Sequence, residues 1–148
     1  SKVFSRYSDF REYVEAENEK PIMSVYHWGY DLSSIKNALV YASSPGLITY
    51  VDQEGLGIYG KTIIINHGAG FYSLYSHLSE INVEENQKVD KTSVIAKSGE
   101  TGLAFGDHLH YGTYLQGIPF DSNEMWDRKY IKQKVITIYN NFFKEDVK

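Results

Sequence analysis

The sequence predicts a mainly β protein, with an antiparallel sheet or sandwich as its core, a small N-terminal element and a C-terminal helix. Between about residues 25 and 116, short runs rich in β-branched and aromatic residues alternate with turn signals. After residue 121, apolar residues recur at helical spacing instead. Strands that follow one another so closely favour an antiparallel arrangement over βαβ units. The 148 residues suit a single core.

The polar N-terminal part, residues 1–24, is expected to form an extension packed on the domain. Within it, residues 9–16 are compatible with a short helix or with an edge strand, and the sequence leaves both open. We place the central domain at residues 25–120 and a helical segment at residues 121–148.

Six runs in the central domain are expected to be strands, because each is rich in residues that favour a pleated surface. Turn signals such as Ser44-Pro45-Gly46 separate them. The expected strands cover residues 40–42, 47–51, 61–66, 70–77, 94–97 and 108–115.

The C-terminal segment carries a helix-start signal, with Asp121 as the expected N-cap and Glu124 three residues later. We expect one or two helices from Ser122 to about Phe143, although residues 134–139 are also compatible with a strand. The apolar residues at helical spacing are Ile131, Val135, Ile138 and Phe142.

Composition excludes several classes of function. The formal net charge of -4, without a basic patch, argues against nucleic acid as the main partner. The absence of cysteine excludes disulfides, cysteine-based zinc sites and a cysteine nucleophile. No apolar run is long enough to span a bilayer. A metal ion would therefore have to be held by histidine and carboxylate side chains.

Two histidine patterns favour a metal site. In Asp-His-Leu-His, a strand would direct His108 and His110 to the same face. In His27-Trp-Gly-Tyr-Asp31, a strand would again place both polar side chains on one face, and Gly29 between them leaves room for both to reach one ion. The alternatives are a pair of surface histidines and a chance His–Asp pair in a loop.

Two further histidines differ in what they suggest. His77 ends a run whose alternation places Phe71, Ser73, Tyr75 and His77 on one face, and it could serve as a base near a metal. A lone histidine at a strand end is more often structural. His67 lies in a turn signal and is expected to be a hairpin residue rather than a ligand.

The chain carries three motifs in a fixed order: H-x-x-x-D, then a histidine that ends a strand, then H-x-H. In this order they resemble the motifs of peptidase family M23, the LytM/lysostaphin group. The similarity extends over roughly residues 25–115. Where family members usually have glycine in one turn, this sequence has Asn86, a residue that tolerates positive φ. Further segments similar to those of the family are Ala42–Ile48, Tyr59–Gly68, Leu74–Leu78 and Thr101–His110.

The resemblance implies a LytM-type fold and one Zn²⁺ ion held by His27, Asp31 and His110. It gives His77 and His108 the catalytic role beside the ion, without deciding which is the base. The implied activity is hydrolysis of peptidoglycan stem-peptide crosslinks, at the D-Ala–meso-diaminopimelate bond, by a zinc-bound water. The implied location is the periplasm or cell envelope, and similarity to a Gram-negative subset suggests a role in cell shape.

Four aromatic residues flank the motifs and are candidates for binding the substrate, or alternatively for packing beneath the sheet. They are Tyr26, Trp28, Tyr75 and Tyr111.

Three other functions remain open at this stage. A catalytically silent LytM domain would bind or regulate another cell-wall hydrolase, although such domains typically lose a ligand that is present here. A partner-binding module would use the C-terminal helix for a homodimer, or a heterodimer with another LytM domain. A metal-free carbohydrate-binding β domain would contain no zinc.

Overall fold

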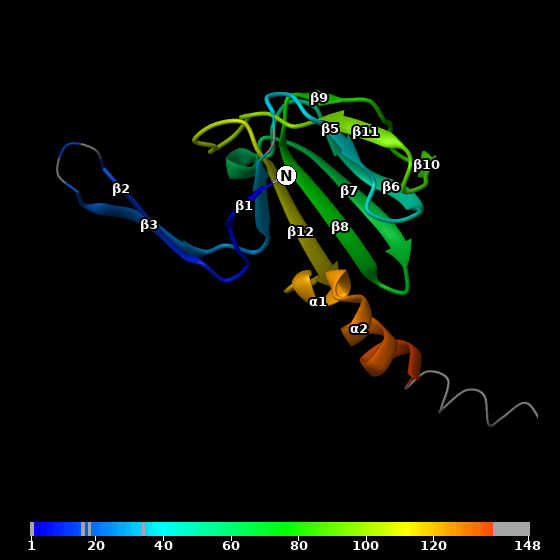
Figure 1. Cartoon of the computed structure of the whole chain (residues 1–148). Coiled ribbons are helices and arrows are strands. Elements are labelled where there is room, and N and C mark those ends of the chain that lie inside the picture. Colours follow the sequence, from blue (N-terminus) through cyan, green and yellow to red (C-terminus); the bar gives the residue numbers. More distant parts are fainter. Residues whose placement is uncertain (1, 16, 18, 34, 138–148) are drawn as a thin grey trace, which may run out of the picture.

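The computed structural model describes residues 2–15, 17, 19–33 and 35–137, and its main element is an antiparallel sheet of eight strands. The strand order is β1-β4-β12-β8-β7-β6-β10, and β13 pairs with β12 (Figure 1). This confirms the predicted mainly β, antiparallel class. The strands are β1 (Lys2–Ser5), β4 (Tyr30–Ser33), β6 (Gly46–Asp52), β7 (Lys61–Gly68), β8 (Phe71–Leu78), β10 (Lys88–Val89), β12 (Leu109–Leu115) and β13 (Ile118–Phe120).

A three-stranded sheet covers one face of the main sheet and encloses the core. It consists of β5 (Leu39–Tyr41), β11 (Val94–Lys97) and β9 (Glu80–Ile81). Ile63 and Ile65 of β7 are fully buried in the same cluster as Val40 and Ile95 of the small sheet. Because side chains alternate along a strand, every second side chain of β8 and β12 points away from this core, to the other face of the main sheet. In the turn before β10, Asn86 has φ 68°, so it takes the conformation expected in place of glycine.

The N-terminal part contributes three strands rather than a helix. β1 extends the main sheet by pairing with β4. β2 (Phe10–Val14) and β3 (Pro21–Tyr26) form a separate hairpin that projects beside this edge (Figure 1). Residues 10–14 therefore adopt the strand alternative. The proposed boundaries at residues 24 and 120 stay predictions.

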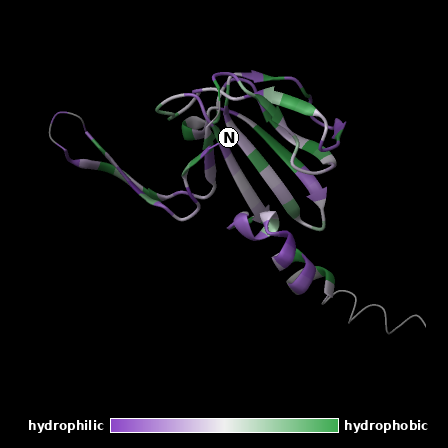
Figure 2. Ribbon diagram, in the orientation of Figure 1, coloured by the Kyte–Doolittle hydropathy of each residue, from purple (hydrophilic) through white to green (hydrophobic). Residues whose placement is uncertain are grey.

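The chain continues after β13 into a helical segment that extends from the end of the sheet (Figure 1). It comprises α1 (Asn123–Trp126), α2 (Arg128–Tyr130) and a π-helical turn (Ile131–Ile136). Figure 2 shows that this segment is mainly hydrophilic. In the described residues, every helix is too short or too polar to cross a bilayer.

The prediction that Asp121 is the N-cap of the first C-terminal helix is wrong. Ser122 occupies the cap position of α1, and the Asp121 carboxylate instead accepts hydrogen bonds from the Asn123 amide and from the hydroxyl of Tyr30. The side chain that caps a helix is Asp127, which accepts from two backbone amides of α2. The expected helix beyond residue 137 lies outside the described residues.

Candidate metal centre

The three predicted ligands, far apart in the sequence, converge on one point. His27 Nε2 lies 3.1 Å from Asp31 Oδ1 and 2.9 Å from His110 Nδ1, and His110 Nδ1 lies 3.1 Å from the same carboxylate oxygen. All three residues are buried. A tetrahedral ion with bonds of about 2.0–2.1 Å would hold its ligand atoms about 3.3 Å apart. The group therefore has the size and chemistry to hold a metal ion.

The local route to this convergence differs from the one the sequence suggested. His27 does not share a strand with Asp31, because residues 27–29 form an irregular link between β3 and β4. Gly29 was expected to leave room for His27 and Asp31 to reach one ion, but the structure requires a glycine here because the backbone lies close to β12. A Cβ built on Gly29 would lie 2.6 Å from the carbonyl oxygen of Tyr111 and 2.8 Å from Cε1 of His110. The link can lie against β12 only without a side chain at this position.

We therefore expect Gly29→Ala to disturb the metal centre and destabilise the fold by about 1–3 kcal/mol, the usual cost of overpacking. Chemical denaturation and zinc titration would measure both effects. Gly112→Ala is the milder comparison, since its added Cβ would lie 3.1 Å from the carbonyl oxygen of Trp28, a tight contact that a shift of a few tenths of an ångström relieves. Equal losses in the two variants would contradict this explanation of Gly29.

His77 and His108 lie beside the three predicted ligands, and each has one ring nitrogen fixed by a backbone carbonyl. His77 Nδ1 donates to the carbonyl of Thr101 at 2.8 Å, and His108 Nδ1 donates to that of Gly106 at 2.7 Å. Because a carbonyl can only accept, both neutral rings keep Nε2 as a free acceptor. His108 Nε2 lies 3.6 Å from Asp31 Oδ1, and the two rings are 4.7 Å apart.

His77 reaches this face through a break in strand alternation. The sequence placed its side chain on the same face as Tyr75, but Tyr75 packs in the core against Tyr111, whereas His77 contacts the rings of His108 and His110. The register of β7 and β8 shifts at this point, and His77 has φ 60°. A non-glycine residue in this region costs about 1–3 kcal/mol, and such residues cluster at functional sites.

Burial and hydrogen bonding tune the charges at the centre. Burial favours a neutral Asp31, but its contacts with His110, His27 and Arg11 outweigh burial and hold the pKa of this carboxyl well below its usual range. Burial lowers the pKa of His77 to about 4, against the opposing hydrogen bond to Thr101. Burial also lowers the pKa of His110. At neutral pH the site therefore offers a carboxylate at Asp31 and neutral imidazoles at His77 and His110, the forms that bind cations and accept protons.

The N-terminal strands supply contacts around the centre that sequence reasoning missed. His27 Nδ1 donates to the carbonyl of Arg6 at 2.8 Å, which leaves Nε2 free toward the other ligands. The ring of Phe4 packs edge-on against His108 at 5.3 Å. Arg11 of β2 forms an ion pair with Asp31. Neither spacing nor residue type distinguishes these residues in a polar segment.

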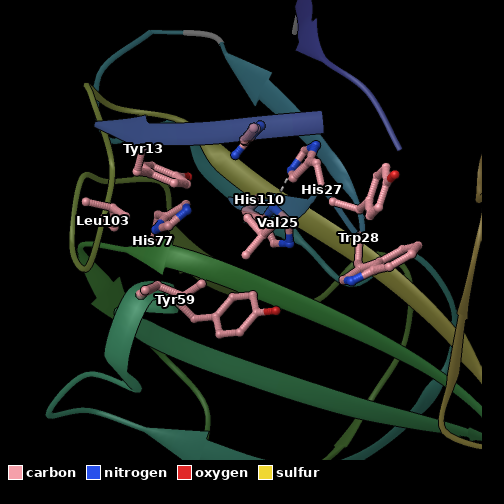
Figure 3. A pocket seen from close by; sticks show the side chains of 11 residues that line it. Tyr13, Val25, His27, Trp28, Tyr59, His77, Leu103 and His110 are labelled. Atoms are coloured by element: carbon pink, nitrogen blue, oxygen red, sulfur yellow. Dashed lines mark hydrogen bonds between the residues drawn. The ribbon is translucent and has the colours of Figure 1, made fainter. Parts of the chain in front are cut away.

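A groove surrounds the centre. A small cavity of about 50 Å³ lies next to the three predicted ligands, between the hairpin and the segments that carry Tyr59 and Leu103. Figure 3 shows Tyr13, Tyr59 and Leu103 around His77. A wider cleft of about 590 Å³ lies between the hairpin and the loop that carries Leu103 and Phe105. The Phe105 side chain is 90% exposed, so this wall is open to a ligand.

The four aromatic candidates divide between the cavity and the core. Tyr26 and Trp28 line the small cavity and are exposed. Figure 3 shows Trp28 among the residues that line this cavity. Tyr75 and Tyr111 are buried in the core, so the prediction that they line the groove is corrected in favour of packing beneath the sheet. His67 lies at the end of β7, where it contacts the carbonyl of Pro45 and the hydroxyl of Ser73.

Comparison with known proteins identifies similar chains. The model of peptidase family M23 matches residues 25–122. The peptidoglycan DD-endopeptidase ShyA of Vibrio cholerae is 33% identical over 65% of this chain and 22% of its own length. The chain spans about a fifth of the curated relatives it matches.

Solved structures of other peptidases are also similar to this chain. A zinc-containing peptidase from Vibrio cholerae is 25% identical, with a TM-score of 0.65 over 82% of this chain and 35% of that chain. The catalytic domain of lysostaphin from Staphylococcus simulans is 23% identical, with a TM-score of 0.68 over 84% of this chain and 90% of that domain. The latter likeness is one of fold, and it supports the predicted LytM-type architecture.

Proposed function

The chain belongs to peptidase family M23, and from this premise we propose that it is a zinc-dependent endopeptidase of peptidoglycan. Its substrate in this proposal is the stem-peptide crosslink, cut between D-Ala and meso-diaminopimelate. The observation that carries the proposal is the convergence of His27 Nε2, Asp31 Oδ1 and His110 Nδ1 within 3.1 Å of one another.

The donor set supports zinc as the metal. Two imidazole nitrogens and one carboxylate oxygen form a three-residue set typical of catalytic zinc sites, which keep a further position open for water or substrate. When bound, zinc polarises a substrate carbonyl and lowers the pKa of water toward neutrality. Its three proposed ligands are His27, Asp31 and His110.

The remaining two histidines are suited to moving protons. The neutral Nε2 of His77 or His108 accepts the proton of the attacking water, and the same ring, once protonated, can deliver it to the leaving amine. The second ring would donate a hydrogen bond to the oxygen on which negative charge develops when its Nε2 also carries a proton. In their neutral forms, both rings are held by the backbone carbonyls of Thr101 and Gly106 in the tautomer that leaves Nε2 free to accept a proton.

The substrate class is supported by relatives and by the shape of the groove. Vibrio cholerae ShyA and ShyB are both named peptidoglycan DD-endopeptidases. Tyr26 and Trp28 at the cavity would contact the peptide in this proposal, and the open cleft beside Phe105 leaves space for a branched crosslink. The corresponding location is the periplasm or cell envelope, where the enzyme would act on wall crosslinks and so on cell shape.

Digestion of purified peptidoglycan tests the reaction and the bond together. We expect crosslinked dimeric muropeptides to disappear and monomers to accumulate, as measured by liquid chromatography and mass spectrometry. A chelator should stop the reaction and added zinc should restore it. A protein that binds zinc but leaves the dimers intact would contradict the proposal and favour a silent LytM domain that regulates another hydrolase.

A further inference from the structure

Asp31 divides its two carboxylate oxygens between different neighbours. Oδ1 faces the metal centre, where both His27 Nε2 and His110 Nδ1 lie 3.1 Å away. Oδ2 faces the hairpin and accepts a hydrogen bond from Nη2 of Arg11 at 2.5 Å. The Asp31 side chain is 3% exposed and that of Arg11 28%, so the ion pair is shielded at its acidic end. Together with the contacts of Oδ1, this charge-assisted hydrogen bond to Oδ2 restricts how the carboxylate can turn.

The hairpin holds Arg11 in place for this contact. Arg11 lies opposite Val25 in the β2–β3 pairing, on the face of the hairpin that lines the cavity. The same Nη2 also donates to the hydroxyl of Ser5, at the end of β1. β1 itself pairs with β4, and Ser5 is the partner of Asp31 in that register. The guanidinium is thus anchored to β1, the neighbour of the strand that carries the carboxylate.

From this geometry we propose that Arg11 is a positioning residue that restricts Asp31 to one-oxygen binding of the metal. By occupying Oδ2, it prevents the carboxylate from turning to offer both oxygens, and so preserves a coordination position for substrate or water. This inference rests on the proposed function. Arg11 lies outside residues 25–122, the span that matches the family model. The N-terminal hairpin is accordingly part of the metal centre in this proposal.

Replacement of Arg11 tests the inference through metal binding rather than activity. Outer contacts to metal ligands typically contribute 10–100-fold in affinity, so we expect Arg11→Met to weaken zinc binding by about that factor in competition with a chromogenic chelator. Arg11→Lys, which keeps the charge and a donor but loses the planar fork, should recover part of the loss. Arg128→Met removes an exposed arginine from α2 and serves as the matched control.

The visible spectrum of the cobalt-substituted protein provides a readout that general destabilisation would not change in the same way. If Asp31 binds with both oxygens once Arg11 is removed, the coordination number rises and the d–d bands weaken relative to wild type and Arg128→Met. Circular dichroism of the metal-free variants verifies folding, and Arg11→Lys gives a milder second variant for the same measurements.

The outcomes separate this inference from the proposed function. A wild-type protein that binds zinc, together with Arg11→Met and Arg11→Lys variants of unchanged affinity and unchanged cobalt spectrum, would overturn the inference alone. A wild-type protein that binds no zinc would overturn the proposed function and the inference with it. Weaker binding with weakened d–d bands in Arg11→Met, but not in Arg128→Met, supports the positioning role.

Discussion

His110→Ala is expected to release the zinc ion and abolish hydrolysis. His110 is 4% exposed and supplies one of three converging ligand atoms. Structural zinc sites bind with roughly 10–16 kcal/mol shared among four ligands, so one ligand accounts for about 3 kcal/mol, or roughly a hundredfold in affinity. Zinc content after dialysis and chelator competition would measure the loss. Activity on peptidoglycan should fall in parallel.

The control for this substitution is His67→Ala. His67 is also a histidine of the main sheet, near the end of β7, but its ring contacts Pro45 and Ser73 and is not among the three converging residues. This variant should keep one zinc ion per chain. An unchanged zinc content in His110→Ala would contradict the assignment of His110 as a ligand, and with it the hydrolase proposal.

His77→Ala is expected to show the opposite combination, with zinc retained and catalysis lost. The Nε2 of His77 is free, and its lowered pKa of about 4 keeps the ring unprotonated at neutral pH, which is the form that can accept a proton. Loss of a general base typically costs ~10²–10⁴ in rate. The measurement is kcat/KM on a purified crosslinked dimer, alongside zinc stoichiometry.

His108→Ala and the double variant complete this test. If the two histidines act as one proton-transfer unit, each single substitution should cost nearly as much as both together, because the effects of such groups are not additive. Independent, multiplicative losses would argue for separate roles. A His77→Ala enzyme with wild-type kcat/KM would exclude His77 from catalysis.

Regular strands were the part of the fold that could be predicted well. The runs at residues 61–66, 70–77 and 108–115 became β7, β8 and β12 with shifts of only one or two residues at their ends. These segments combine β-branched and aromatic residues with clear turn signals, so local preference and tertiary packing agree. His108 and His110 both face Asp31, as expected, although His108 lies just before β12, where it forms a bridge with Gly99.

The prediction failed where a side chain's direction depends on a distortion or on a partner. His77 faces the metal centre through a positive φ that no alternation pattern reveals. The faces of Tyr75 and Tyr111 could not be assigned until the position of the small sheet was known. The capping of the C-terminal helices also shifted, because Asp121 pairs with the hydroxyl of Tyr30, a residue distant in the sequence.

By itself, the sequence determined the β class and the ligand chemistry, because side-chain type and strand periodicity are local properties. The order H-x-x-x-D, His and H-x-H also carried the family resemblance. Only the tertiary structure decided that His27, Asp31 and His110 meet within 3.1 Å, and that Arg11 reaches Asp31 from a separate hairpin. These contacts join β4, β12 and the N-terminal strands, and their distances depend on how the sheet and hairpin pack together.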